Sequence, residues 1–149
     1  MTQVKIYTEL NHEHGLPVYA NPGDSGMDIR ANVAITLQPK ETKLIPTGIY
    51  VGIPDGYEIQ VRPRSGLSLK TKLRVANTPG TVDVQYRGEV CIILENTHSS
   101  VESHITKGER IAQIVLQEVP KIEWVQVNSK DDLGDTVRGD GGFGSTGTQ

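Results

Sequence analysis

Apolar and polar residues alternate along several short runs of the chain, and glycine and proline separate these runs from one another. The clearest alternation lies in YEIQVRPR (57–64), where Tyr57, Ile59 and Val61 fall on one face of an extended strand. EVCIILEN (89–96) is apolar almost throughout and predicts a strand that is buried on both faces. Three further strands are expected, at VKIYTEL (4–10), RIAQIVLQEV (110–119) and IEWVQV (122–127).

Helical patterns are almost missing from the sequence. No long window shows a hydrophobic period of about 3.6 residues, and only GLSLKTKL (66–73) could form a short helical turn. Turn signals such as QPKE (38–41) and PDG (54–56) lie between the apolar runs. Many short strands with almost no helix predict an all-β fold, either a sandwich, a barrel or a jelly roll.

The composition changes from about residue 128 onward, where the chain becomes rich in Gly, Asp, Ser and Thr. Such a segment buries too little surface to offset its own ordering entropy, so a disordered terminus is one interpretation. The segment could also order on a ligand, because glycine leaves backbone N–H groups free to close around phosphate oxygens. Phe143, the only phenylalanine in the chain, would be out of place in a mere tail. We therefore expect a β domain over 1–127 and a flexible arm over 128–149.

The overall composition limits the function further. The 149 residues fit one domain, and hydrophobic residues make up 36% of them and aromatic residues 5%. That is a lean core for a protein that works alone, so oligomerisation could supply additional burial. The formal net charge of −3 excludes a general basic surface for nucleic acid. A polyanionic ligand would need a few placed cations or a metal.

The single cysteine, Cys91, excludes an internal disulfide, and its apolar neighbours predict a buried position on a strand. The N-terminus has no apolar stretch of signal-peptide length, and no run approaches the roughly 20 apolar residues that cross a bilayer. These features predict a cytoplasmic protein without a membrane partner.

Asp83 and Tyr86 are the first candidates for chemistry. If they flank a turn at Val84–Gln85, a carboxylate and an aromatic ring lie on one face of a hairpin. The first could act as a base and the second as a stacking platform. Val-Gln is a poor sequence for a type I′ turn, so the turn type stays open. An ordinary surface hairpin with an Asp83–Arg87 ion pair is the alternative.

Arg62 and Arg64 share the polar face of their strand, and Ser65 and Gly66 end it. Cations, a hydroxyl and a free N–H gathered at a strand end suit a phosphate, although a solvated arginine face is an equal alternative.

Three other groups of polar residues are candidates. Asp24 and Asp28 stand near glycines, and for Asp24 turn formation is the better interpretation. Gln113 either faces a ligand or is a buried, hydrogen-bonded glutamine. His12 and His14 would share one face of an extended segment, but two histidines without a third ligand are weak support for zinc.

Five segments in order resemble the ordered motifs of the trimeric dUTPases, and the resemblance covers residues 22–147. They are PGDSGMDIRA (22–31), PRSG (63–66), GTVDVQYRGE (80–89), GERIAQ (108–113) and RGDGGFGSTG (138–147). The resemblance implies a jelly roll that assembles as a homotrimer, with three active sites between subunits. It also implies Mg²⁺-dependent hydrolysis of dUTP to dUMP and pyrophosphate, which limits uracil in DNA and supplies dUMP for thymidylate synthesis.

The resemblance assigns the nucleoside to the hairpin. Asp83 matches the residue that orients and deprotonates the attacking water, and Tyr86 matches the tyrosine under the deoxyribose. Asn77 matches the asparagine that reads the uracil edge together with backbone groups of the hairpin, and Gly80 and Val82 are placed in the same substrate-binding set.

The resemblance also assigns the phosphates and the metal. Arg64, Ser65 and Gly66 match the motif that holds the α- and β-phosphates, and Gln113 matches a contact to phosphate or ordered water. Asp28 matches the aspartate that holds Mg²⁺ through water, which suits an ion that retains several of its waters.

The resemblance gives the arm a function. Phe143 matches the phenylalanine that stacks on uracil when the arm closes. Arg138, Ser145 and Thr146 match residues that grip the γ-phosphate, and Gly144 belongs to the same substrate-binding set.

Two rival interpretations remain. A dCTP deaminase shares the fold but would need a longer chain and a catalytic glutamate near PRSG, and would lack the FGSTG tail. A non-catalytic trimeric β module would be expected to lose Asp83, Tyr86 or the tail, and all three are present.

Overall fold

The computed structural model describes residues 1–147 and is mostly β, with a single short α-helix among these residues. This confirms the predicted fold class at the level of mostly β with almost no helix. The N-terminal strands are β1 (Lys5–Thr8), β2 (Met27–Arg30), β3 (Ile35–Leu37), β4 (Thr42–Pro46), β5 (Ile49–Gly52) and β6 (Tyr57–Arg62). The helix α1 (Ser65–Lys70) is followed by β7 (Leu73–Val75), β8 (Gly80–Val82), β9 (Cys91–Asn96), β10 (Ser103–Ile105) and β11 (Arg110–Glu118), and by a 3-10 helix, η1 (Lys130–Leu133).

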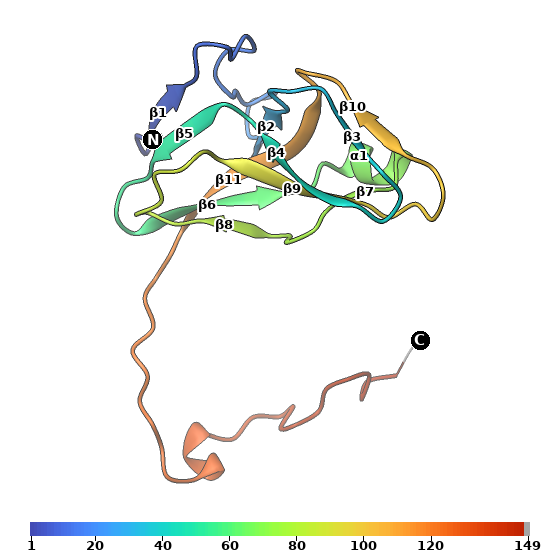
Figure 1. Cartoon of the computed structure of the whole chain (residues 1–149). Helices are drawn as coiled ribbons and strands as arrows, with labels where there is room; N and C mark the ends of the chain where they lie inside the picture. The colour runs from blue at the N-terminus through green and yellow to red at the C-terminus, as the bar shows by residue number, and fades with distance from the viewer. Residues whose placement is uncertain (148–149) are drawn as a thin grey trace.

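The strands form four antiparallel sheets. The largest has the order β2-β11-β6-β8, and a three-stranded sheet has the order β4-β9-β7. Two small sheets, β1-β5 and β10-β3, complete the body. Since most neighbours in the larger sheets are far apart in sequence, the sheets bring together segments from the whole length of the body (Figure 1).

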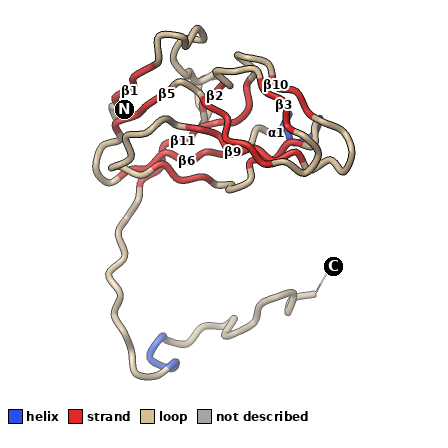
Figure 2. Tube along the Cα trace, in the orientation of Figure 1, coloured by secondary structure: helices blue, strands red, loops and turns tan. Residues whose placement is uncertain are grey.

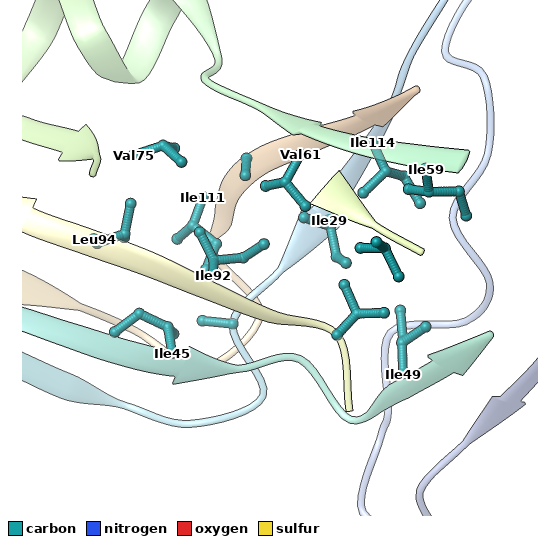
Figure 3. Close-up of a cluster of buried hydrophobic side chains, with 14 of the residues drawn as sticks. Ile29, Ile45, Ile49, Ile59, Val61, Val75, Ile92, Leu94, Ile111 and Ile114 are labelled. Atoms are coloured by element: carbon teal, nitrogen blue, oxygen red, sulfur yellow. The ribbon is translucent and has the colours of Figure 1, made fainter. Parts of the chain in front are cut away.

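One hydrophobic core lies between the two larger sheets. Ile29, Val61 and Ile111 project from the four-stranded sheet, and Ile92 and Leu94 from the three-stranded sheet, into the same cluster (Figure 3). Each of these five side chains is at most 5% exposed. Burial on this scale stabilises the fold by about 1.5–3 kcal/mol for each large aliphatic side chain.

The alternation predicted from the sequence is present in β6, because Ile59 and Val61 are buried while Glu58, Gln60 and Arg62 are only half-buried. The prediction for 89–96 was wrong in one respect. In β9 only alternate residues are buried, and Cys91 and Ile93 on the other face are half-buried. A sheet that is covered on one side within a single chain gives this pattern.

The strand predicted at 122–127 does not form. After Glu118 the described residues contain no strand, and Ile122, Trp124 and Val125 are exposed. The segment runs away from the body as an extended chain (Figures 1 and 2), so its backbone groups have no neighbouring strand to pair with. The boundary expected at 127/128 stays a prediction, and the last two residues of the expected arm lie outside the described residues.

Within residues 1–147, no helix is both long and apolar enough to cross a membrane.

Candidate active site

The turn predicted at Val84–Gln85 forms directly after β8. The Tyr86 N–H donates to the Asp83 carbonyl at 3.0 Å, which closes a four-residue turn. Neither central residue has a positive φ, so the turn is not type I′, in agreement with its sequence. The expected hairpin was wrong, because β8 pairs only with β6 and the chain after the turn does not return along β8 as a strand.

The alternative of an Asp83–Arg87 ion pair is not realised in the structure. Arg87 Nη1 donates instead to the carbonyls of Val84 and Tyr86, both at 2.8 Å. Arg87 thus fastens the turn, and within residues 1–147 no ion pair involves the exposed Asp83 carboxylate. That carboxylate remains available to accept a proton or a hydrogen bond from a ligand.

A cavity of about 250 Å³ opens beside the turn, and Asp83 and Tyr86 both line it. Its walls include Leu44 from β4 and Cys91 and Ile93 from β9, so the cavity combines apolar side chains with the Asp83 carboxylate. We call it the turn cavity.

Two of the predicted substrate-binding residues, Gly80 and Val82, can offer a ligand only their backbone groups. The Val82 side chain is only 8% exposed and belongs to the core, so the residue can present only its peptide groups. Gly80 lies against Asn77, because a Cβ on Gly80 would come within 3.2 Å of the Asn77 Nδ2. The structure therefore brings Asn77, Gly80, Val82, Asp83 and Tyr86 together along β8 and its ends.

A second cluster forms where β2, β11 and the end of β6 meet. Arg64 Nε donates to Asp28 Oδ1 at 2.6 Å, and Arg110 Nη1 donates to Asp28 Oδ2 at 3.2 Å. Ser65 and Gly66, in the first turn of α1, are exposed directly beside Arg64. The arrangement joins two guanidinium groups around one carboxylate, with the exposed Ser65 next to Arg64 in sequence, and such donors suit an anionic ligand.

Gln113 belongs to the same cluster through the sheet register. In β11 it pairs with Asp28 of β2 on one side and with Arg62 of β6 on the other. Its Nε2 donates to the Pro63 carbonyl at 2.9 Å, so the amide is half-buried and held. A Cβ on Gly26 would overlap the Gln113 Oε1, so a larger residue there would displace the amide from this position.

The two clusters lie far apart within one chain. Val82 pairs with Ile59, and continuing this register places Asp83 opposite Glu58. From position 58 to position 64 the chain extends roughly 20 Å along β6. The structure thus does not bring Asp83 together with Arg64, Ser65 and Gly66.

The predicted arm residues stay away from both clusters. Arg138 Nε donates to the Gly141 carbonyl at 2.7 Å, and Ser145 N–H donates to the Gly142 carbonyl at 3.0 Å, so these bonds close within the arm. Phe143 is fully exposed with a φ of 51°, and Gly144 and Thr146 are exposed beside it. No hydrogen bond or ion pair joins residues 120–147 to the body.

The other polar candidates have structural partners. Asp24 Oδ2 accepts from the Asn21 N–H at 2.8 Å, which confirms the turn interpretation. The rings of His12 and His14 meet edge to face at 5.6 Å. Among residues 1–147 no group of three or more His, Cys, Asp or Glu side chains could hold a metal ion directly.

Sequence reasoning missed two residues that the structure brings into these clusters. Arg110 contacts Asp28, and its charge at the start of a predicted strand within GERIAQ was the available signal. Glu89 lines the turn cavity, and its place at the end of the GTVDVQYRGE motif was the available signal.

A mostly β body with a carboxylate beside an aromatic ring, and a separate cluster of guanidinium groups, has the side chains that an anionic, ring-containing ligand would contact. A sequence model described as dUTPase matches residues 12–147. The chain is 50% identical to a deoxyuridine 5'-triphosphate nucleotidohydrolase of Finegoldia magna, covering 97% of this chain and 99% of the relative. It is 49% identical to the enzyme of that name from Fusobacterium nucleatum, covering 97% of each chain. The chain therefore belongs to the dUTPase family.

A solved structure of Staphylococcus bacteriophage 80alpha dUTPase with dUPNHPP is similar in fold. The TM-score is 0.87 at 28% identity, and the match covers 99% of this chain and 100% of the phage protein.

Proposed function

We propose that this protein hydrolyses dUTP to dUMP and pyrophosphate, with water attacking the α-phosphorus. The observation that carries the proposal is the Asp83 carboxylate, which has no ion-pair partner among residues 1–147 and shares the turn cavity with Tyr86. Full-length relatives that are named for this activity, and a phage dUTPase solved with dUPNHPP, support the choice of substrate.

Asp83 acts as the general base. An exposed carboxylate with no competing cation can orient a water and accept its proton, and such help accelerates a reaction by roughly 10²–10⁴-fold. Tyr86 packs against the deoxyribose. A ribose 2′-hydroxyl there would clash with the ring or be buried without a partner, which costs about 1–3 kcal/mol.

The uracil edge is read beside Asn77. The Asn77 amide lies next to Gly80, and Gly80 and Val82 can contribute only peptide groups, because glycine has no side chain and the Val82 side chain is buried. Cytosine exchanges donor and acceptor on the same edge, so a polar reader of this kind discriminates against it.

The arginine cluster holds the phosphates. Arg64, Ser65, Gly66 and Gln113 supply donors to the α- and β-phosphates, where negative charge grows as pyrophosphate leaves. When Arg64 turns toward phosphate, the Asp28 carboxylate is released from its 2.6 Å ion pair.

Asp28 fits a water-mediated Mg²⁺ site. Among residues 1–147 it belongs to no group of three or more His, Cys, Asp or Glu side chains that could form a direct ligand set, and Mg²⁺ commonly takes one or two carboxylates, several waters and phosphate oxygens. The ion supplies neutralisation of the triphosphate charge when it is bound.

The active site is shared between subunits of a homotrimer with the jelly-roll topology. Asp83 and Ser65 must both reach the α-phosphate region, but roughly 20 Å of strand separates them within one chain. A site assembled from the turn cavity of one subunit and the arginine cluster of another removes this separation. The exposed apolar residues Trp124, Val125 and Leu44 add surface that an assembly could bury.

The arm closes over the bound nucleotide. Phe143 stacks on uracil, while Arg138, Ser145, Thr146 and the Gly144 N–H contact the γ-phosphate. Closure excludes water and aligns the triphosphate for in-line attack, and reopening releases the product. The exposed Phe143, without a hydrogen-bonded link from arm to body, supports an arm that is free to do this. A single cysteine and a nucleotide substrate fit a cytoplasmic site of action.

The test is pyrophosphate release from dUTP, dCTP, dTTP and UTP with Mg²⁺, with ammonia measured in parallel. The proposal predicts rapid release from dUTP, and release from UTP reduced by about 5- to 150-fold. Ammonia from dCTP would identify a deaminase instead. A folded protein that released neither product would identify a non-catalytic module.

A further inference from the structure

The segment that follows Tyr86 is fastened to the turn between β4 and β5. The Gly48 N–H donates to Glu89 Oε1 at 2.7 Å, and the Val90 N–H donates to the Ile49 carbonyl at 2.8 Å. The Thr47 hydroxyl also donates to the Val90 carbonyl. Only the first of these bonds depends on a side chain of the fastened segment, and that side chain is the carboxylate of Glu89.

Tyr86 is held in turn by the backbone of Glu89. Its hydroxyl donates to the Glu89 carbonyl at 2.8 Å, so the ring folds back over residues 88–89. A Cβ on Gly88 would overlap the Tyr86 hydroxyl, which shows how closely the ring lies on this segment. The position of the ring therefore follows the position of Glu89.

The anchor itself is rigid. Gly48 is buried with a φ of 70°, and a Cβ there would come within 2.7 Å of the Asn32 Nδ2. The Gly48 carbonyl accepts from the Glu9 N–H at 2.9 Å, which ties the turn to the N-terminal segment as well. Because Gly48 is buried, loss of the Glu89 acceptor would leave its N–H without a partner, and that is costly.

We infer that Glu89 is a positioning residue for Tyr86: its bond to the Gly48 N–H sets the ring where it selects deoxyribose over ribose. This inference rests on the proposed function of Tyr86. Glu89 also lines the turn cavity with Asp83 and Tyr86. A change in its bond to the Gly48 N–H, which we call the tether, would therefore move the cavity wall that faces the sugar.

The test compares Glu89→Ala with Glu89→Gln. Alanine removes the acceptor, whereas glutamine retains an oxygen that can accept from Gly48. Glu41→Ala is the matched control, because Glu41 Oε2 also accepts from a backbone N–H, that of Gln38 at 2.6 Å, in a different turn. The kinetic constants for dUTP and UTP and the melting temperature are measured for each variant.

Glu89→Ala is expected to lower the ratio of kcat/KM for dUTP over UTP by about 5- to 10-fold, mainly through a higher KM for dUTP. Glu89→Gln should restore most of that ratio, and Glu41→Ala should leave it unchanged even if its melting temperature falls.

An unchanged ratio in Glu89→Ala would overturn the inference and leave the proposed function intact. A Glu89→Gln variant with the same low ratio as Glu89→Ala would also overturn the inference. That result would show that the charge of residue 89, and not its hydrogen bond to the Gly48 N–H, sets the discrimination. Wild-type protein without dUTP hydrolysis would instead refute the proposed function itself. If Glu89→Ala does not fold, Gly88→Ala, which displaces the ring without touching the tether, should give the same loss of discrimination, and its failure to do so would overturn the inference.

Discussion

At the scale of single residues, the proposal depends on how differently two aspartates are placed. Asp28 is engaged by Arg64 and Arg110 at 2.6 and 3.2 Å, whereas Asp83 has no ion-pair partner among the residues that the structure describes. A general base needs an accessible carboxylate, and a residue that pairs with guanidinium groups is suited to binding. The chemistry of the turn cavity should therefore depend on Asp83.

Asp83→Asn is expected to lower kcat by about 10²–10⁴-fold with little change in the affinity for the nucleotide, because the base is lost while the cavity remains. Pyrophosphate release gives kcat, and calorimetry with a non-hydrolysable dUTP analogue gives the affinity. Asp55→Asn, in the exposed PDG turn, is the control and should behave like wild type. Wild-type turnover in Asp83→Asn would contradict the assigned role.

Cys91 offers a test of the electrostatics of the same cavity. Burial, followed by the charge of Glu89, raises the pKa of the Cys91 thiol from about 9 to about 11. The folded state thus holds its proton more tightly than the unfolded state. The stability from this group is complete below pH 9 and is lost as the pH rises through 11.

Alkylation of Cys91 at pH 8 is expected to be about 100-fold slower than that of a free thiol. The thiolate is the reactive form, and raising the pKa by two units lowers the thiolate fraction at pH 8 by about 100-fold. The rate of iodoacetamide labelling of the native protein measures it, with the urea-unfolded protein as reference. Equal rates in the two states would show that neither burial nor Glu89 protects the thiol.

The identities of the site residues could be proposed from the sequence, because the motifs place unusual polar groups next to glycines. The contacts of these residues could not be predicted in the same way. The Asp28–Arg64 pair joins β2 to the end of β6, and the Glu89–Gly48 bond joins two turns far apart in sequence. Such partners depend on sheet register across the whole body, and no local pattern encodes it.

At the scale of elements, the period of hydrophobicity predicted strands well where a partner strand exists in the same chain. β6 and β11 lie side by side and follow the alternation or the apolar run that predicted them. The run at 122–127 has the composition of a strand but no neighbour, and it stays extended and exposed. Composition supplies strand propensity, but a strand also needs a partner, and this segment pairs with none of the sheet edges of its own chain.

The arm is the element whose removal is expected to separate folding from catalysis. Deleting 138–149 should leave the melting temperature within about 2 °C of wild type, because no hydrogen bond or ion pair joins residues 120–147 to the body. The same deletion should lower kcat/KM for dUTP by at least about 100-fold, since closure supplies alignment and exclusion of water. Calorimetric melting and pyrophosphate release measure the two effects.

Phe143→Ala is the milder counterpart of this deletion and should raise KM for dUTP more than it lowers kcat. Full activity in the truncated protein would contradict the closing arm.

At the scale of the whole molecule, the lean core and the separated clusters both favour an assembly. Three chains of 16.3 kDa would form a particle of about 49 kDa, which light scattering can distinguish from a monomer. The low hydrophobic share of 36% could suggest an assembly from the sequence. The sequence could not show that the turn cavity and the arginine cluster are too far apart within one chain to form a single site.

Subunit complementation tests the shared site. Asp83→Asn and Ser65→Ala each damage every site of their own homotrimer. When the two are unfolded together and refolded, some mixed trimers should contain a site with intact Asp83 from one chain and intact Ser65 from another. Activity is expected to rise well above the sum of the two separate variants. No gain on mixing would contradict a site that is built from two chains.

The central claim is that water attacks the α-phosphorus of dUTP. Hydrolysis of dUTP in water enriched in ¹⁸O, followed by mass spectrometry of both products, tests it most directly. The account predicts that the label enters dUMP and that pyrophosphate carries none. Label in pyrophosphate would place the attack on the β-phosphorus and contradict the account.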